Sequence, residues 1–117
     1  MASREAGAAA EQRALQFLFS QGLQLVEANF RSRHGEIDLI LREGAVLVFA
    51  EVRMRSREDF GGAGASISVT KQTKLIKTAQ IYLMRFPKPP PCRFDALLLG
   101  AAEAGAIEWI KDAFRAD

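Results

Sequence analysis

The sequence predicts a single-domain α/β protein with a mixed central sheet flanked by helices. Two strand-like runs, 35–42 and 45–53, are joined by Glu43-Gly44, which is typical of a hairpin. A helical apolar stripe follows them, and two more strand-like runs come after that. The chain has 117 residues, of which 49% are hydrophobic and 26% charged. These values are typical of one soluble globular domain, so we expect one sheet with helices packed on its faces.

The first predicted element is a helix over residues 8–20. Its start is rich in alanine, the best helix former, and Gly22 follows at a plausible stop. The apolar stripe at helical spacing contains Ala8, Leu15, Leu18 and Phe19. Residues 23–30 predict a first strand that ends in the basic segment 31–34. Residues 1–4 are expected to be disordered.

The second half predicts a helix between two irregular segments. Residues 54–68 contain a glycine-rich loop, and Thr70 is a reasonable N-cap for a helix that ends near Phe86. The proline run at 87–91 ends that helix. The apolar stripe consists of Leu75, Ile76, Ala79, Tyr82, Leu83 and Phe86. Residues 92–99 and 106–110 then predict two closing strands, so the order is αβββαββ.

Composition excludes several classes of protein. Sixteen Lys and Arg against 14 Asp and Glu give a net charge of +2, which permits a nucleic-acid partner without requiring one. The single cysteine, Cys92, excludes an internal disulfide and a cysteine-based zinc site. No apolar run reaches the roughly 20 residues that span a bilayer, and no secretion signal is visible. We therefore expect a cytoplasmic protein that does not bind membranes.

Asp38 and Glu51 form the candidate catalytic pair. If the hairpin turns tightly at 43–44, Asp38 pairs near position 49 and Glu51 lies diagonally beyond it, within reach of one shared cation. A slip of one residue would move one carboxylate to the other face. Mg²⁺ or Mn²⁺ prefers oxygen ligands, and the carbonyl of Val52 would add a third. Arg53 is placed to stabilise charge on a phosphate.

Glu11 gives a separate argument from the first helix. At about 100° per residue it lies between Leu15 and Leu18, inside the apolar stripe. A buried carboxylate without a partner is costly, so Glu11 should meet a metal-bound water or a basic side chain at the sheet. The alternative is that it lies at the edge of the stripe and reaches water. Glu36 is read as a solvated or ion-paired residue with a lesser supporting role.

Several segments carry a resemblance that covers about Glu11 to Phe114. GEIDLI, VFAEVRMR, FGGA, a lysine-rich helix and RFDA resemble the YraN-like family of small bacterial proteins. That family is similar to a branch of the PD-(D/E)XK nuclease superfamily, close to the archaeal Holliday-junction resolvases. The resemblance implies a restriction-endonuclease-like core, a Mg²⁺-dependent and structure-selective DNA endonuclease, and a homodimer. By motif, Asp38 takes the metal-binding aspartate's place, Glu51 that of the (D/E) residue and Glu11 that of a first-helix glutamate.

One departure from the motif bears on catalysis. Arg53 stands where the motif has lysine, and arginine cannot lose its proton to assist a water nucleophile. The first alternative is therefore a nucleic-acid-binding module without turnover. A second alternative is a protein-interaction domain on the same scaffold.

Basic residues near these acids are candidates for a phosphate-binding rim. Such contacts position a nucleic acid without reading its sequence. A solvated helix face and an ordinary loop are the alternatives, and His34 is read as an ordinary loop residue. Asp95 is read as a hydrogen-bonded strand residue. The rim candidates are Arg31, Arg33, Arg53, Arg55, Arg57, Lys71, Lys74 and Lys77.

Overall fold

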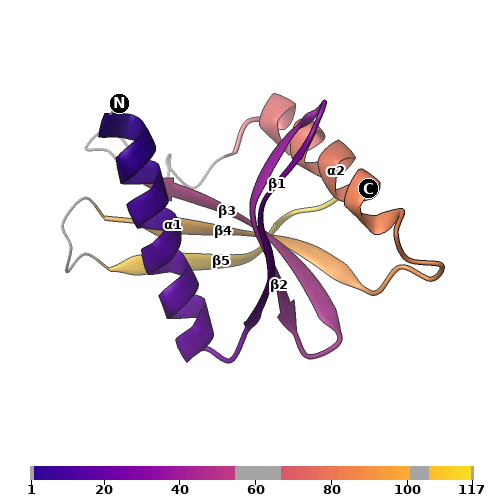
Figure 1. Cartoon of the computed structure of the whole chain (residues 1–117), viewed down its shortest axis with the longest axis horizontal. Coiled ribbons are helices and arrows are strands. Elements are labelled where there is room, and N and C mark those ends of the chain that lie inside the picture. Colours follow the sequence, from indigo (N-terminus) through magenta and orange to yellow (C-terminus); the bar gives the residue numbers. More distant parts are fainter. Residues whose placement is uncertain (1, 55–66, 101–105, 117) are drawn as a thin grey trace.

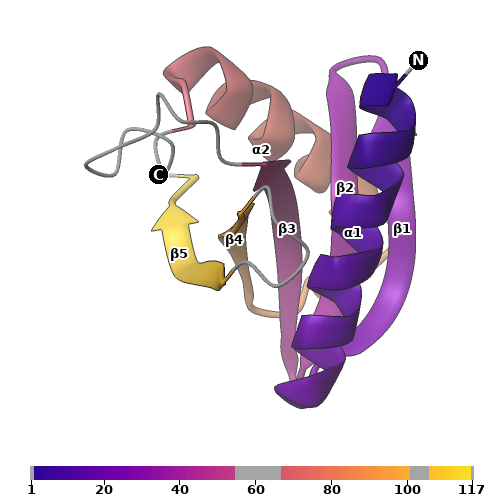
Figure 2. The same ribbon diagram turned by 90° about the vertical axis from the view of Figure 1, so that its left-hand side faces the viewer.

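A five-stranded sheet lies between two helices in the computed structural model, which describes residues 2–54, 67–100 and 106–116, with side chains from residue 7 onward. Helix α1 covers one face of the sheet and α2 lies against the other (Figures 1 and 2). The order αβββαββ and the mixed sheet are confirmed. The elements are α1 (Ala2–Ser20), β1 (Gln24–Ser32), β2 (Gly35–Glu43), β3 (Val46–Met54), α2 (Val69–Leu83), β4 (Cys92–Leu99) and β5 (Ile107–Phe114).

The strands lie in sequence order, β1-β2-β3-β4-β5. Three of the four pairings are antiparallel, and β3 pairs with β4 in parallel. The parallel pair follows from the connection through α2. A helical crossover returns the chain to the end of the sheet at which β3 began, so β4 runs in the same direction as β3. Both central strands are buried along most of their length. That burial explains their nearly continuous apolar sequences.

The β2–β3 turn lies one residue later than expected. Glu43 pairs with Val46, so the loop is Gly44-Ala45 rather than Glu43-Gly44. Gly44 has a φ of 59°, a conformation that glycine adopts without strain at the first central position of a II′ hairpin turn. The pairing shifts by two positions, so each β3 residue keeps its face.

The core beneath α2 is largely aromatic. Phe49 stacks on Phe94 at 5.5 Å between ring centroids and meets the edge of Tyr82 at 6.0 Å. The predicted α2 stripe is confirmed, since Leu75, Ala79 and Tyr82 are buried and the other members are partly buried.

The core beneath α1 uses smaller residues on the helix side. Ala10 and Ala14 are buried with Leu18, one turn apart, against β2, β3 and β4. The expected stripe was wrong at two positions, because Ala8 is exposed and Phe19 is 49% exposed. Because alanine side chains are small, the axis of α1 can lie close to the sheet. The face of α1 that is buried is therefore the one that contains Ala10 and Ala14.

Several element boundaries also differ from the expected ones. Helix α1 begins at Ala2 rather than Ala8, while the expected disorder of residues 1–4 stays a prediction. Helix α2 begins after Ser68, whose hydroxyl accepts from the Lys71 N–H at 3.1 Å, so Thr70 is not the N-cap. The helix ends at Leu83, before Phe86. Strand β5 continues to Phe114, four residues beyond the expected end.

The expected loop falls mainly outside the described residues, which resume at Ile67. In the part of the chain that the structure describes, neither helix combines the length and apolar character needed to cross a membrane.

Candidate metal site

Strands β2 and β3 stop pairing where Asp38 begins. The ladder runs from Glu43↔Val46 to Leu39↔Ala50. At the next step Asp38 Oδ2 accepts the backbone N–H of Val52 at 2.8 Å. A side chain thus takes the place of the next strand carbonyl, and this contact fixes Asp38 at the point where the sheet opens.

Face alternation in β2 breaks at the same place. Leu39 and Leu41 pack beneath α1 and Ile40 beneath α2, as strand alternation requires. Ile37 packs beneath α2 with Ile40, whereas strict alternation would place it on the face of Leu39. The break coincides with the end of the ladder, and it leaves Asp38 at the boundary between the two layers.

Glu51 continues the α2-facing side of β3, after Leu47 and Phe49. The observed register sets it directly opposite Asp38 rather than diagonally beyond it. The Glu51 residue is only 8% exposed. The Asp38 and Glu51 carboxyl groups are close enough to interact electrostatically. The expected convergence of the two acids is therefore present, with a closer pairing than the sequence suggested.

The electrostatics of this pair follow from burial and like charge. Burial, followed by the neighbouring Glu51 carboxylate, raises the pKa of Asp38 to about 7, against the lowering effect of the Val52 N–H. Two carboxylates this close resist ionising together. Protonation of Asp38 or binding of a divalent cation would each relieve this repulsion.

Glu11 reaches the pair from α1. Burial and the Asp38 charge raise the pKa of Glu11 above its ordinary value. Glu11 therefore lies beside Asp38 at the sheet, while the expected metal-bound water or basic partner stays a prediction. The carboxyl groups of Glu11 on α1, Asp38 on β2 and Glu51 on β3 thus lie one after another where the sheet opens. We call these three residues, together with Glu36, the acidic cluster.

Asn29 is a polar residue of this cluster that the sequence reading missed. With its amide nitrogen turned toward the acids, Asn29 donates to Glu11 Oε1 and Glu36 Oε2, both at 3.2 Å. Its backbone is left-handed, with a φ of 56°, a conformation that asparagine tolerates better than most residues. The amide separates Glu36 from Glu11, and Arg31 Nε holds Glu36 from the other side at 3.1 Å.

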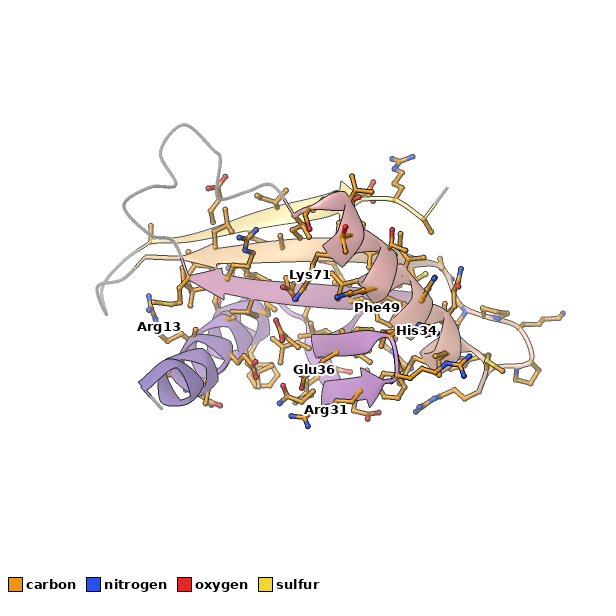
Figure 3. The ribbon with its side chains drawn as sticks, turned by 90° about the horizontal axis from the view of Figure 1, so that it is seen from above. Arg13, Arg31, His34, Glu36, Phe49 and Lys71 are labelled. Atoms are coloured by element: carbon orange, nitrogen blue, oxygen red, sulfur yellow. The ribbon has the colours of Figure 1, made fainter. Side chains whose placement is uncertain are left out.

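A lysine from α2 completes the other end of the cluster. Lys71 Nζ lies 3.1 Å from Glu51 Oε2. Figure 3 shows Lys71 on α2 above β3, with Glu36 on the adjacent β2. Both Lys71 and Glu51 line a pocket of about 300 Å³ together with Arg53 and Ser68. In the described part of the chain, the lining of this pocket therefore contains one buried acid and two basic side chains.

Lys71 lies at the end of α2 where a cation is least favoured. It is in the first turn, which contains no acidic residue, so the helix dipole opposes its charge. Ser68 caps its N–H, and Glu51 pairs with its ammonium. A residue that breaks a local rule and pairs with a buried acid is a typical feature of functional sites.

The donor set fits a hard divalent cation in an open site. Carboxylate oxygens are the ligands that Mg²⁺ prefers, usually one or two of them with waters. Nowhere in residues 7–54, 67–100 and 106–116 do three Asp, Glu, His or Cys side chains close around a single point. The fit therefore rests on Asp38 and Glu51. Val52 contacts Asp38 through its N–H, and the role of its carbonyl as a ligand stays a prediction.

The remaining basic candidates divide into two groups. Arg31 is paired with Glu36, at the far side of the cluster from Lys71. Arg33, Lys74 and Lys77 line a separate pocket of about 440 Å³ with His34. Arg55 and Arg57 lie outside the described residues.

Asp95 is a structural residue, as expected. It is 1% exposed and accepts from Arg93, from the Trp109 indole at 2.9 Å and from the Asp112 N–H at 2.9 Å. Arg93 also pairs with Glu43. These partners satisfy the carboxylate, so it needs neither metal nor substrate.

Comparisons with known proteins place the sequence among relatives of similar length. Residues 10–99 match the family described as Uncharacterised protein family UPF0102. A UPF0102 protein of Janthinobacterium sp. (strain Marseille) is 53% identical over 115 residues, covering 98% of this chain and 91% of the relative. One from Methylobacillus flagellatus is 51% identical, covering 97% and 99%. One from Nitrosomonas europaea is 54% identical over 108 residues, covering 92% of each.

Proposed function

The chain belongs to the UPF0102 family, and from the chemistry of its acidic cluster we propose that it is a divalent-metal-dependent DNA endonuclease. The family name carries no activity, so the support comes from the site. The proposed reaction is hydrolysis of a phosphodiester bond. The resemblance to the PD-(D/E)XK superfamily makes branched DNA the first substrate to test.

The observation that carries the proposal is the pair Asp38 and Glu51. Two partly or fully buried carboxyl groups face each other at the end of a strand ladder, where burial and the Glu51 charge raise the pKa of Asp38 to about 7. Burying two carboxyl groups side by side lowers the stability of the folded protein. A cost of this kind is typical of residues that serve binding or catalysis. Binding of a Mg²⁺ or Mn²⁺ ion offsets that cost, and carboxylates strained in this way are common at functional sites.

Each residue then has a role that its position supports. Asp38 and Glu51 would hold the ion, which would supply charge stabilisation and an activated water. Glu11 would accept a proton or orient a water beside Asp38. Arg53 lines the pocket beside Glu51 and would hold a phosphate oxygen, as its fixed charge and planar donors suit.

Lys71 can take the place of the lysine that the nuclease motif has at position 53. Strand β3 has Arg53 there, yet the Lys71 ammonium lies 3.1 Å from Glu51 in the same pocket. The Lys71 ammonium can donate to a water and orient it, and only the neutral amine, a form that arginine does not adopt, could accept a proton from that water. We therefore assign the lysine function to Lys71 and phosphate binding to Arg53.

The second candidate is a DNA-binding module without turnover. Arg53 is the observation that favours it, since the usual motif residue is missing from β3. The two candidates make different predictions for Lys71→Gln. Under the nuclease proposal this change removes activity, whereas a binding module loses at most some affinity.

Cleavage assays test the proposal directly. Purified protein, incubated with branched and nicked DNA, should cut only when Mg²⁺ or Mn²⁺ is present. Asp38→Asn and Lys71→Gln should each lower the rate by at least about 100-fold, the scale for loss of a catalytic group. Glu27→Gln is the matched control. Glu27 lies on β1 outside the acidic cluster and pairs with Arg85. Cleavage by Asp38→Asn at the parent rate would rule the proposal out.

A further inference from the structure

We propose that the pocket lined by Arg33, His34, Lys74 and Lys77 is a second site, which binds the phosphodiester backbone of a DNA strand next to the acidic cluster. We call it the basic groove. Its position along the strand rests on the proposed nuclease function, whereas its affinity for DNA backbone does not. Arg33, Lys74 and Lys77 were expected in one rim around the acids, and His34 was expected to be an ordinary loop residue.

The groove is held by contacts between the β1–β2 turn and α2. Ser32 Oγ and Thr78 Oγ1 are hydrogen-bonded at 2.9 Å, and the His34 N–H donates to Ser32 Oγ at 3.0 Å. Gly35 lies so close to α2 that an added Cβ would lie 3.5 Å from Lys74 Cβ. Figure 3 shows His34 at this turn beside α2. The turn is therefore fixed against the helix, and the basic side chains of both elements surround one hollow.

The charges of the groove are not balanced within it. Among the residues that the structure describes, its lining contains no carboxylate, and the other lining residues are Val69, Thr70 and Thr73. Across the described part of the chain, no acidic side chain forms an ion pair with Arg33, Lys74 or Lys77. Lys71 and Arg31 differ in this respect, since each is paired with a glutamate of the cluster.

His34 has a specific place in this arrangement. Arg33 Nε donates to His34 Nε2 at 3.4 Å, which leaves the other ring nitrogen, Nδ1, to contact a ligand. An imidazole N–H can donate a directed hydrogen bond to an anion. The groove thus offers both charge and directed donors, which suits phosphate oxygens.

The spacing along α2 connects the groove to the acidic cluster. Lys71, Lys74 and Lys77 follow at intervals of three residues, which corresponds to a rise of about 4.5 Å for each interval. Phosphates of one DNA strand rise about 3.4 Å along the duplex axis. If a duplex lies with its axis along α2, the groove is about one to three phosphates from Lys71 along the same strand. A row of cations at regular spacing suits the repeating phosphates of a DNA strand better than a compact acidic peptide.

Binding without metal is the test, because it leaves the nuclease reaction out. A labelled nicked duplex of roughly 20 base pairs is titrated with full-length protein in EDTA, and anisotropy is followed at several salt concentrations. Arg33→Gln, Lys74→Gln and Lys77→Gln should each weaken binding several-fold and lower the salt slope by about 0.7–0.9. Lys88→Gln, an exposed change in the proline-rich segment, should bind as the parent does.

Two further variants keep the result interpretable. Lys74→Arg retains the charge and should restore most of the affinity, which a folding defect would not allow. Asp38→Asn should bind in EDTA at least as tightly as the parent, because it removes a negative charge from the neighbouring cluster. If cleavage fails while the groove variants lose binding, the groove stands and the nuclease proposal falls.

The opposite outcomes overturn the groove. If the triple variant Arg33→Gln/Lys74→Gln/Lys77→Gln binds like Lys88→Gln, these side chains do not contact the backbone, whatever the cleavage assay shows. If poly-glutamate displaces the parent from DNA as well as unlabelled duplex does at equal charge, the groove recognises acidic protein instead.

Discussion

Replacing Asp38 with asparagine should make the metal-free protein more stable at neutral pH. The asparagine Oδ1 can still accept the Val52 N–H, and its amide can donate to Glu51, so the local contacts are kept. What is lost is the cost of a second carboxylate. A pKa raised from 3.8 to about 7 corresponds to at most about 4 kcal/mol, at 1.36 kcal/mol for each pH unit. Allowing for coupling to Glu51, we expect a gain of roughly 2–3 kcal/mol.

The pH dependence of that gain identifies its cause. Because the folded protein raises the pKa of Asp38, folded molecules bind more protons than unfolded ones between about pH 4 and pH 7. The free energy of unfolding of the parent therefore falls as pH rises through this window. Below pH 4 Asp38 is neutral in both states, and the parent and Asp38→Asn should have nearly equal stability. Above pH 7 the difference should be largest.

Urea denaturation at pH 4, 5.5 and 8 in EDTA measures this difference. Glu27→Gln is the control, since its half-exposed ion pair with Arg85 is worth at most about 1 kcal/mol. The reasoning is refuted if Asp38→Asn is no more stable than the parent at pH 8, or if its advantage is the same at all three pH values. Addition of Mg²⁺ should narrow the gap, because only the parent gains binding energy.

Three further changes test other parts of the site. Lys71→Met should bind Mn²⁺ roughly tenfold more tightly, because it removes a positive charge that competes with the ion for Glu51, at an effective dielectric constant of about 20. Weaker binding in a calorimetric titration would contradict this. Asp95→Ala should cost about 3–5 kcal/mol in urea unfolding, because Arg93, the Trp109 indole and the Asp112 N–H all lose a buried acceptor and Arg93 keeps only Glu43, while Mn²⁺ affinity is unchanged. Ser68→Ala should cost about 1 kcal/mol through loss of the α2 cap and should slow cleavage, because Lys71 lies in the same turn; an unchanged rate would separate the cap from the site.

Local patterns were sufficient for the strands and for the acid pair. Apolar and β-branched runs bounded by glycine or proline predicted all five strands, with errors only at their ends. The hairpin turn was placed one residue early, since Glu43-Gly44 and Gly44-Ala45 are both acceptable two-residue turns by composition. Because the pairing moved by two positions, Asp38 and Glu51 kept the same face and changed from diagonal to directly opposite positions.

Tertiary packing decided what periodicity could not. Phe19 was assigned to the buried stripe of α1 because it is large and apolar, yet the helix approaches the sheet through Ala10 and Ala14. The ion pair between Lys71 and Glu51 joins residues 20 positions apart through the docking of α2, and no local pattern predicts that distance. Asn29 had one available signal, namely that asparagine tolerates a left-handed backbone, but its two acidic partners come from different elements.

Calorimetric titration with Mn²⁺ tests most directly whether the opening between β2 and β3 is a cation site. The parent should bind a single ion, and both Asp38→Asn and Glu51→Gln should abolish binding while Glu27→Gln leaves it unchanged. Equal Mn²⁺ affinity in all four proteins would mean that the paired acids do not hold the metal.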